Sequence, residues 1–560
     1  MPDIIETIRH AVIGGAESVP GPFGLRPMVY ADYTASGRAL NFIEDYIRNR
    51  VLPLYANTHT ESSGTGLQTQ SFREDARGLI ARSLGARDEH AVLFCGSGTT
   101  GAIDRLVAIL GLRIPSNLED RYKLSEHIPA DERPVVFVGP YEHHSNEIPW
   151  RESIADVVTI PEDADGHIDL VALETELKRY QGRPRLIGSF SAASNVTGIM
   201  TDTEAVSTLL HRYDALAFWD YAAAAPYVGI DMGSPESGPG YYDAIYISTH
   251  KFIGGPGTPG LLVLRKELCD NRVPAVPGGG TVTYVNPEDH AYLADIEHRE
   301  EGGTPDIVGA IRAGLVFQLK DAVGSGTIEA REHRFVRKAI RRWEKHPSLD
   351  ILGSRDAPRL SIVSFIVKEN GSEEGRFLHH NFVVAVLNDL FGIQARGGCS
   401  CAGPYGHRLL GIDIARSQEF EREITGGGEG IKPGWVRVNF NYFIDDETFE
   451  YILAAIEMVA EHGPKLMRHY RFYPESGLWR HRDGVAAAPL SLNDISYESG
   501  EMVYRCDAGR CEDASLGEHL EHARTLIEGL CSSTDPSLEP PTTTADFEKL
   551  RWFSYPCEIA

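Results

Sequence analysis

Residues 94–103 read FCGSGTTGAI, which carries an apolar segment through a Gly/Thr turn into an apparent helix. Such a turn leaves unpaired backbone N–H groups and the positive end of a helix dipole beside the hydroxyls of Thr99 and Thr100. Those groups suit a phosphate. Ordinary strand-to-helix turns share this pattern, so the turn alone does not show whether it binds a phosphate. The surrounding sequence gives further evidence.

The surrounding sequence alternates short apolar segments with helical patterns from about residue 90 to residue 265. The apolar segments are AVLFCGSG (91–98), PVVFVGP (134–140), RLIGSFSA (185–192), ALAFWDYA (215–222) and AIYISTH (244–250). Strands that alternate with helices predict parallel βαβ units, with both faces of the sheet covered. Ligands bind at the carboxyl ends of such strands, and polar side chains follow the apolar segments there: Thr99, Thr100, His143, Asn195, Asp220 and Lys251.

A second region follows this pattern. Helical patterns at 304–323, 329–344 and 446–462 and strand patterns at 359–367 and 434–443 predict a smaller α+β domain. We therefore expect four parts: an N-terminal segment at 1–30 that packs with the small domain, a large domain at 31–320, a small domain at 321–470 and an extension at 471–560.

Two stretches lie outside these patterns. The polar, glycine-rich residues 412–433 predict a mobile surface insertion. The extension at 471–560 is acidic, with 8 Lys+Arg against 16 Asp+Glu. Its segment DPSLEPPTTTAD (535–546) is typical of a linker or a disordered stretch.

Composition excludes several classes of protein. The formal net charge of −26 argues against nucleic acids and anionic membranes as partners, because both carry negative phosphates. No apolar run approaches the roughly 18 residues of a membrane span. The first residues lack a basic region before an apolar core, so we expect no secretory signal. Eight scattered cysteines do not indicate a disulfide framework, which predicts a cytoplasmic protein.

The stretch STHKFIGGPGTPG (248–260) ends a strand pattern with Lys251 and a glycine-rich turn. A lysine in a buried cleft can lose its proton and react with aldehydes, although a surface lysine beside a turn has the same local sequence. Asp220 ends another strand pattern. Its carboxylate would either cap the helix that follows or pair with a buried cation. With the phosphate turn, these residues suit pyridoxal 5′-phosphate (PLP), which offers an aldehyde, a basic ring nitrogen and a phosphate.

Eight sequence blocks resemble, in this order, the class V aminotransferase-like enzymes, specifically the group II cysteine desulfurases and selenocysteine lyases. The blocks are VYADYTASG (29–37), GSGTTGAI (96–103), EHHSNEIPW (142–150), SNVTG (194–198), WDYAAA (219–224), STHK (248–251), EGGTPD (301–306) and RGGCSCAGP (396–404). The resemblance covers roughly residues 28–465. It implies an α/β protein of PLP-dependent transferase fold type I, with a mostly parallel sheet in the large, PLP-binding domain and a smaller α+β domain.

For the cofactor ring, the resemblance implies four residues. Lys251 would form the Schiff base with the cofactor and later move a proton. Asp220 would meet the ring nitrogen, and His143 would stack on the ring and relay protons. Asn195 would lie near the phenolic oxygen of the cofactor and the substrate carboxylate.

For the phosphate and the substrate, the resemblance implies further contacts. The phosphate would contact Thr99, Thr100, Ser248 and His250, together with Thr304 of the neighbouring subunit, which implies a homodimer with shared sites. Arg396 and Arg437 would hold the substrate α-carboxylate, a task suited to a planar bidentate donor.

The sequence departs from the family pattern in several places. Ala223 stands where the family usually has a glutamine that binds the phenolic oxygen of the cofactor. Gly403 stands where glutamine often follows the cysteine. The 412–433 insertion and the tail beyond residue 470 are further departures, and these departures bear on the reaction rather than on the fold.

The loop RGGCSCAGPYGH (396–407) contains two cysteines, and only one fits the family register. Cysteine stands five residues after the arginine in that register, which singles out Cys401 as the nucleophile that takes sulfur from the substrate. Neighbouring Arg396 would favour its thiolate. If the loop is extended, Cys399 lies beside Cys401, where it would relay sulfur or simply fill space.

We expect no metal in this protein. A zinc clip at the two loop cysteines would need two more ligands, and His407 is the only nearby candidate. In the tail, CDAGRC (506–511) with His519 and His522 has the residue types of a zinc site, but its irregular spacing indicates surface or packed thiols.

Three readings of the function remain at this point. The first is a PLP-dependent cysteine desulfurase-like enzyme that acts on cysteine or selenocysteine and passes sulfur from Cys401 to an acceptor protein. The second is a PLP-dependent lyase, aminotransferase or epimerase that acts on another amino acid without Cys401. The third is a PLP-fold scaffold or sulfur-binding protein whose acidic tail is an interaction module.

Overall fold

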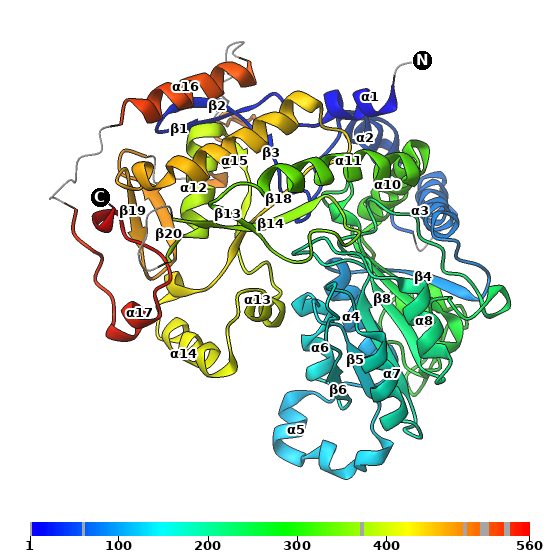
Figure 1. Ribbon diagram of the computed structural model, residues 1–560. Helices are drawn as coiled ribbons and strands as arrows, with labels where there is room; N and C mark the ends of the chain where they lie inside the picture. The colour runs from blue at the N-terminus through cyan, green and yellow to red at the C-terminus, as the bar shows by residue number, and fades with distance from the viewer. Residues whose placement is uncertain are drawn as a thin grey trace. The chain divides into compact units, whose positions relative to one another are not determined.

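The computed structural model describes residues 3–58, 62–369, 375–484, 490–504, 515–530 and 538–559. The chain forms two compact units (Figure 1). Unit 1 comprises residues 1–12, 33–333 and 353–360, and unit 2 comprises residues 13–32, 334–352 and 361–560. The long helix α11 (Ser325–Trp343) contains the boundary between them. Within the described ranges, no helix is both long and apolar enough to cross a membrane.

Unit 1 is built on a seven-stranded sheet with the order β4-β10-β9-β8-β7-β5-β6. Only β10 runs antiparallel to its neighbours β4 and β9, so the other six strands share one direction. The strands are β4 (His90–Cys95), β5 (Val135–Val138), β6 (Asp156–Thr159), β7 (Leu186–Ser191), β8 (Leu216–Asp220), β9 (Ala244–Ser248) and β10 (Gly260–Arg265). The predicted α/β fold with a mostly parallel sheet is confirmed.

Helices cover both faces of this sheet. Alternate side chains of a strand point to opposite faces, so Phe218 packs in the core with α4 while Trp219 donates from its indole to Ser207 of α8. The helices of unit 1 are α1 (Ile4–Ala11), α2 (Asn41–Tyr46), α3 (Gly64–Ser83), α4 (Gly98–Ile109), α5 (Ser116–Tyr122), α6 (Ile148–Arg151), α7 (Leu170–Arg179), α8 (Thr203–His211), α9 (Ile296–Glu300) and α10 (Ile307–Val323). A hairpin of β11 (Val282–Val285) and β12 (His290–Tyr292) completes the unit.

Unit 2 contains a five-stranded antiparallel sheet with the order β13-β14-β18-β17, and β15 pairs with β14 beside this path. Its strands are β13 (Leu349–Ile351), β14 (Ile362–Lys368), β15 (Phe377–Leu378), β17 (Arg396–Gly398) and β18 (Trp435–Asn439). Small two-stranded pairs join β1 (Ser18–Gly21) to β2 (Gly24–Pro27), β3 (Val29–Tyr30) to β16 (Ile393–Gln394), and β19 (Tyr470–Tyr473) to β20 (Leu478–His481).

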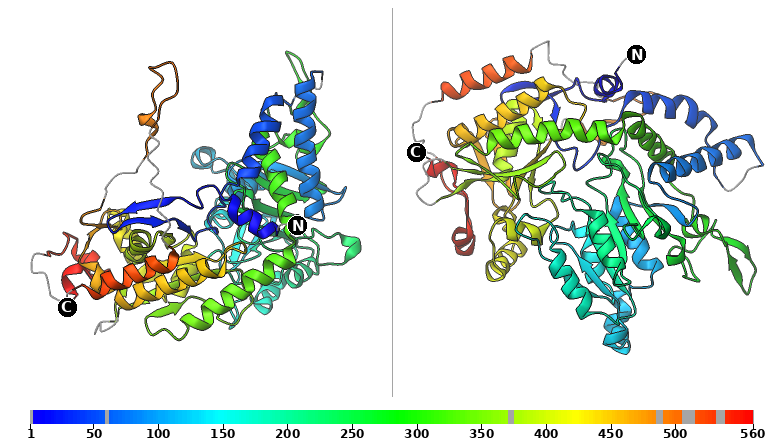
Figure 2. Two further views of the ribbon diagram at one scale, coloured as in Figure 1. Left: turned by 90° about the horizontal axis from the view of Figure 1, so that it is seen from above. Right: turned by 45° about the vertical axis from the view of Figure 1, so that its right-hand side comes forward.

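The helices of unit 2 are α12 (His380–Phe391), α13 (Gly403–Leu409), α14 (Ile414–Thr425), α15 (Asp446–Met467), α16 (Leu516–Glu528) and α17 (Ala545–Leu550). Helix α16 lies along α15, and the two views of Figure 2 show the pair side by side. Residues 13–32 belong to this unit and residues 3–12 to unit 1.

Two helices lie in or beside the stretches expected to be a surface insertion and a linker. The 412–433 insertion is largely helical, because Asp413 caps α14 with its side chain and Phe420 gives that helix a buried contact. In the stretch expected to be a linker, residues 535–537 lie outside the described residues and residues 538–544 form no helix or strand. Thr544 then caps α17, whose Phe547 and Leu550 are buried. A few buried apolar side chains among polar neighbours are enough to fix both helices.

Candidate active site

The Gly/Thr turn lies where β4 meets α4 in unit 1. The backbone N–H of Thr99 donates to Ser248 Oγ at 3.0 Å, and that hydroxyl lies 3.4 Å from Thr99 Oγ1. A Cβ on Gly98, which has a φ of +55°, would lie 2.8 Å from Ser248 Oγ and 2.9 Å from the ring of His250. The structure therefore brings Thr99, Ser248 and His250 together around a turn that only glycine fits.

The histidine predicted to stack on the cofactor follows β5. Ser145 donates from its backbone N–H to His143 Nδ1 at 3.1 Å, and its hydroxyl lies 3.0 Å from the same atom. Because Nδ1 accepts a hydrogen bond, the ring proton of the neutral imidazole sits on Nε2. The Ser145 hydroxyl also lies 2.6 Å from Thr100 Oγ1, so this serine links His143 to the phosphate turn.

Asp220 ends β8 as a buried carboxylate, 3% exposed. Burial raises its pKa, while the N–H of Ala222, at 2.8 Å, and the positive charge of Lys251 act to lower it. Lys251 is half-buried and follows β9 in the 3₁₀ turn Thr249–Lys251. The predicted lysine and aspartate thus lie close enough for their charges to interact.

The first sequence block packs against the lysine turn. The N–H of Gly37 donates to the carbonyl of His250 at 2.8 Å. A Cβ on Gly37 would lie 1.8 Å from the carbonyl oxygen of Phe252, so no other residue fits there. This contact explains why the glycine of the first block accompanies the STHK motif.

The cysteine loop lies in unit 2, between β17 and α13. Arg396 of β17 pairs in register with Arg437 of β18. Arg437 is 3% exposed, and its Nη2 donates to Asp32 Oδ1 at 2.7 Å. Arg396 is half-buried. The two predicted carboxylate-binding arginines are therefore neighbours, and one of them already has an anionic partner.

Cys401 lies in a turn rather than in extended chain. Ser400 and Cys401 have φ values of 52° and 56°, and the N–H of Ala402 donates to the carbonyl of Cys399 at 3.1 Å. Positive φ at two successive non-glycine residues costs about 1–2 kcal/mol for each and is typical of functional loops. The condition under which Cys399 would lie beside Cys401, an extended loop, is therefore not met.

Comparison with known proteins places the chain in a family. Residues 29–417 match the family model of class-V aminotransferases. A probable cysteine desulfurase from Halalkalibacterium halodurans is 29% identical over 68% of this chain and 85% of that protein. A cysteine desulfurase from Dickeya dadantii is 27% identical over 68% and 84%. The structure of a cysteine desulfurase from Thermococcus onnurineus superposes with a TM-score of 0.64 at 23% identity, covering 82% of this chain and 99% of that one.

The chain belongs to the class-V aminotransferase family. Members of this family depend on PLP, so the protein is a PLP-dependent enzyme. The residues present fit that cofactor. The cradle around Gly98 gathers the hydroxyls of Thr99 and Ser248 at the N-terminus of α4, where a phosphate would be held. The buried carboxylate of Asp220, with its pKa raised by burial, suits a protonated ring nitrogen.

Sequence reasoning missed a buried carboxylate beside His143 in this class-V aminotransferase. Glu142 accepts hydrogen bonds from the backbone of Gly139 and Ser191, the hydroxyl of Ser191 and the amide of Asn146. Burial raises its pKa to about 7. Glu142 ties β5 to β7 and fixes the turn that carries His143. The EHHSNEIPW block contains both Glu142 and Asn146, so the sequence did contain a signal for this buried contact.

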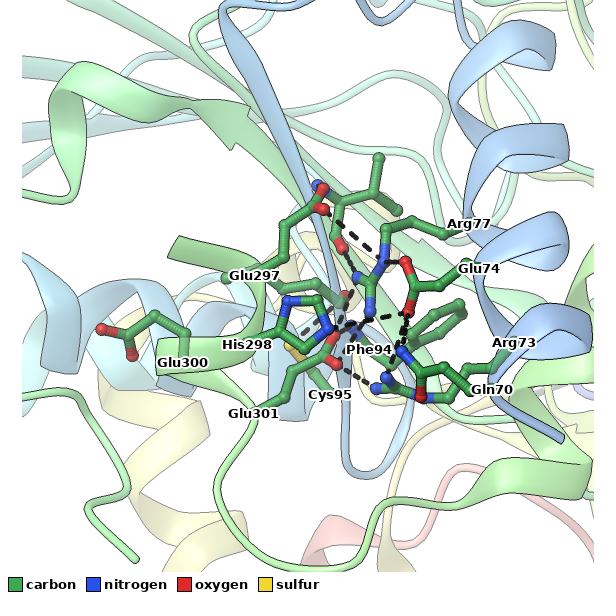
Figure 3. A network of polar contacts seen from close by, with 12 residues as sticks. Gln70, Arg73, Glu74, Arg77, Phe94, Cys95, Glu297, His298, Glu300 and Glu301 are labelled. Atoms are coloured by element: carbon green, nitrogen blue, oxygen red, sulfur yellow. Dashed lines mark hydrogen bonds and ion pairs between the residues drawn. The ribbon is translucent and has the colours of Figure 1, made fainter. Parts of the chain in front are cut away.

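A buried ionic network supports the segment that carries Thr304 (Figure 3). Glu301 accepts hydrogen bonds from Arg73 and Arg77 of α3, and its carboxylate lies 3.0 Å from Arg77 Nη2. It also accepts a hydrogen bond from the backbone N–H of Phe94 at 2.6 Å. Burial acts to raise the pKa of Glu301, but the charges of Arg77 and Arg73 hold it below its ordinary value. A carboxylate buried with two guanidinium partners stays charged.

The same network closes the outer edge of the sheet. Strand β4 is an edge strand, and its outward N–H groups at Val92 and Phe94 donate to Glu297 and Glu301. Arg77 donates to the carbonyl of Val92. The strand that leads into the phosphate turn is thereby joined to the segment that leads to Thr304. Thr304 itself is exposed, and Asn57 lies 3.4 Å from its hydroxyl.

Among the described residues, no group of three or more His, Cys, Asp or Glu side chains could hold a metal. Cys95 and Cys269 are buried, which raises the pKa of each thiol to about 12. Cys399 and Cys401 are half-buried in the loop. The tail motif CDAGRC at 506–511 lies outside the described residues. Of its two candidate partners, His519 is buried on α16, and His522 Nδ1 lies 2.9 Å from Arg26 Nη2.

Proposed function

We propose that the protein is a cysteine desulfurase: it converts L-cysteine to L-alanine, leaves the sulfur as a persulfide on Cys401, and passes it to an acceptor. The observation that carries this proposal is the turn at Cys401, five residues after Arg396, in a class-V aminotransferase that also brings Thr99, Ser248 and His250 together and places Lys251 near Asp220. The names of the curated relatives support the same reaction.

In this proposal the pocket of unit 1 holds the cofactor and moves protons. Thr99, Thr100, Ser248 and His250 hold its phosphate, and Asp220 keeps its ring nitrogen protonated. When bound, PLP supplies an electron sink for the carbon that loses its α-proton. Lys251 Nζ takes that proton from the substrate. His143 and Asn195 lie at the carboxyl ends of β5 and β7, where they orient the ring and the substrate.

The sulfur transfer belongs to Cys401. Its thiolate forms a bond to the sulfur of the substrate while the Cβ–S bond of the substrate breaks. Cβ receives the bonding electron pair and a proton and becomes the methyl group of alanine. The transferred sulfur remains on Cys401 as a persulfide. Cβ is reduced by two electrons, and the pair of sulfur atoms that forms the persulfide is oxidised by the same two electrons. The step needs no external oxidant or reductant.

The two arginines contribute unequally to substrate binding in this proposal. Arg437 is almost fully buried and donates to Asp32, which suits it to shaping the site. Arg396 is half-buried at the start of the loop and is the stronger candidate for the substrate α-carboxylate. The Arg437–Asp32 pair then fixes the strand against which Arg396 is registered.

One observation favours a second candidate function. Ala223 is 6% exposed and has no polar side chain at the position where the family has glutamine. The loss of that hydrogen-bond donor changes how the cofactor is held. A PLP-dependent lyase, aminotransferase or epimerase that acts on another amino acid without Cys401 is therefore the alternative.

We also propose that the protein is a homodimer in which Thr304 reaches the phosphate of the partner's site. Thr304 is exposed on a segment that Glu301 anchors through its buried network. Four large apolar side chains between residues 52 and 67 of unit 1 also lie exposed: Leu52, Leu54, Tyr55 and Leu67 are 43–52% exposed. They support a contact surface between two copies of the chain. Sedimentation analysis of the purified protein would show a dimer, and a stable monomer would contradict it.

The direct test is product analysis with purified enzyme and L-cysteine in the presence of a thiol acceptor. We expect alanine and sulfide in equal amounts from the wild type and neither from Cys401→Ser. Cys399→Ser is the matched control and should keep its alanine production. If Cys401→Ser makes alanine at the wild-type rate, the desulfurase proposal is wrong and the second candidate takes its place.

A further inference from the structure

Two regions outside the family pattern pack against each other in unit 2. Helix α14 of the insertion and helix α17 of the tail lie side by side (Figure 1). Lys549 Nζ donates to Glu419 Oε1 at 2.8 Å, and the hydroxyl of Thr544 donates to Glu423 Oε1 at 2.9 Å. We call residues 414–431 together with residues 544–555 the brace.

The tail half of the brace is built into the core. Phe553 is fully buried, and its ring lies 4.6 Å from the ring of His379 and 5.1 Å from that of Phe472. The backbone of Phe377 donates to the carbonyl of Trp552 at 3.2 Å, which adds the tail to the edge of the sheet at β15. Arg551 packs over the ring of Tyr555 at 4.1 Å. This part of the tail is a structural component of unit 2.

The insertion half is fixed by two ring N–H groups. His379 Nε2 lies 3.1 Å from the carbonyl of Gly430, and Trp552 Nε1 donates to the carbonyl of Ile431 at 3.0 Å. Because His379 Nδ1 accepts from the N–H of Asn381, its Nε2 carries the proton that is donated. Burial lowers the pKa of His379 to about 3, so the ring stays neutral.

The brace reaches the cysteine loop through His380. The indole of Trp552 stacks on the imidazole of His380, with ring centroids 5.7 Å apart and an interplanar angle of 12°. A Cβ on Gly434 would lie 2.9 Å from that imidazole and 2.8 Å from Gly398. A Cβ on Gly397 would lie 3.1 Å from the same ring. The ring of His380 therefore packs directly under the strand that leads into the turn of Cys401.

We propose that the brace positions the turn that carries Cys401, with Trp552 and His380 as positioning residues. Close-packed interiors transmit small displacements, and the turn is held at two successive positive φ values that its surroundings must enforce. The insertion and the tail thus act together as one support for the nucleophile. This proposal rests on the proposed function only for the role of Cys401, because the packing itself does not depend on the reaction.

Two measurements separate this role from a general loss of stability. The first is amide hydrogen exchange in the peptide that contains residues 396–406, and the second is single-turnover persulfide formation on Cys401. For Trp552→Ala we expect exchange in this peptide to rise at least about tenfold, because its local opening becomes easier. Persulfide formation should fall at least about tenfold, since a misplacement of about 1 Å can cost about a hundredfold. The absorbance of bound PLP should not change. Trp552→Phe keeps a stacking ring and should recover most of the rate.

Surface variants keep the test informative if Trp552→Ala fails to fold. Lys549→Glu places two carboxylates against each other and should raise exchange in the 396–406 peptide by about twofold. The charge-swapped variant Glu419→Lys, Lys549→Glu should restore the wild-type value. Tyr497→Ala, which removes an exposed aromatic ring elsewhere in the tail, is the matched control.

Folded Trp552→Ala protein with wild-type exchange in the loop would overturn the proposal. If Trp552→Ala does not fold, wild-type hydrogen exchange in the 396–406 peptide of Lys549→Glu protein would also overturn the proposal. A wild-type enzyme that forms no persulfide would instead refute the proposed function, and hydrogen exchange would still decide whether the brace holds the loop.

Discussion

The lysine pocket of unit 1 and the cysteine loop of unit 2 are assembled in different ways. The pocket gathers residues that each stand within a few positions of a strand end, and the parallel sheet brings those ends to one edge. In our proposal, the loop depends on three distant stretches: the side chains at 379–380 and 552–553 and the backbone at 430–434. A site made by sheet topology tolerates change outside its strands, whereas a site made by long-range packing depends on segments that carry no chemistry of their own.

The largest expected effect is in the lysine pocket. Lys251→Ala should lower alanine formation from L-cysteine by at least about 10³-fold, because a positioned acid–base group is removed together with the anchor of the cofactor. Lys266→Ala, at an exposed lysine in the same unit, is the control. Alanine would be measured by chromatography. Near-wild-type turnover by Lys251→Ala would contradict the assignment of the pocket.

The ionic network is expected to have the next largest effect, on stability. Glu301→Gln takes the buried carboxylate away from Arg73 and Arg77, whose remaining carboxylate partners, Glu74 and Glu297, are more exposed to solvent. The loss should cost up to about 3–5 kcal/mol in the free energy of unfolding. Because the folded-state pKa of Glu301 is below its ordinary value of 4.5, its stabilisation is full at neutral pH and is lost as the pH falls through that lower pKa. Urea unfolding would measure this, with exposed Glu288→Gln as the control. An equally stable Glu301→Gln protein would show that the network does not hold unit 1 together.

The packing of the brace can be compared with that network directly. Phe553→Ala removes a fully buried ring and should cost about 3–5 kcal/mol in the free energy of unfolding. Lys549→Ala, at an exposed ion pair, should be indistinguishable from the wild type in thermal unfolding. If the two variants behave alike, residues 544–555 are not part of the core of unit 2.

A smaller, pH-dependent effect is expected at Glu142. Burial raises its folded-state pKa from 4.5 to about 7, so ionising it destabilises the folded protein. The penalty grows as the pH rises from 4.5 to 7 and reaches about 3 kcal/mol. Glu142→Gln should remove this slope from a plot of unfolding free energy against pH. An unchanged slope in the variant would show that Glu142 does not titrate in this range.

The difference between the two regions also explains what the sequence could predict. Strand patterns and family blocks located Thr99, His143, Asp220 and Lys251, because each stands next to an apolar strand. Asn195 and Ser248 followed from the same logic. The sheet order was harder to foresee, since β10 runs against its neighbours and carries no motif residue.

Contacts between residues far apart in the sequence could not be predicted from the sequence patterns. Glu301 was part of a quoted block, but its pairing with Arg73 and Arg77 depends on how α3 lies against β4. Trp552 stands in an acidic tail without periodicity, and nothing nearby in the sequence indicates that it stacks on His380. Positive φ at Ser400 and Cys401 could not be foreseen, because serine and cysteine have no local preference for it.

The central claim is that Cys401 takes the sulfur. Its most direct test is mass spectrometry of tryptic peptides after one turnover of the PLP-loaded enzyme with L-cysteine, with thiols alkylated on quenching. We predict that the peptide containing Cys399 and Cys401 gains one sulfur atom, located on Cys401 by fragmentation, with no gain on Cys95, Cys269 or Cys557. Alanine produced with no added sulfur on Cys401 would contradict the account.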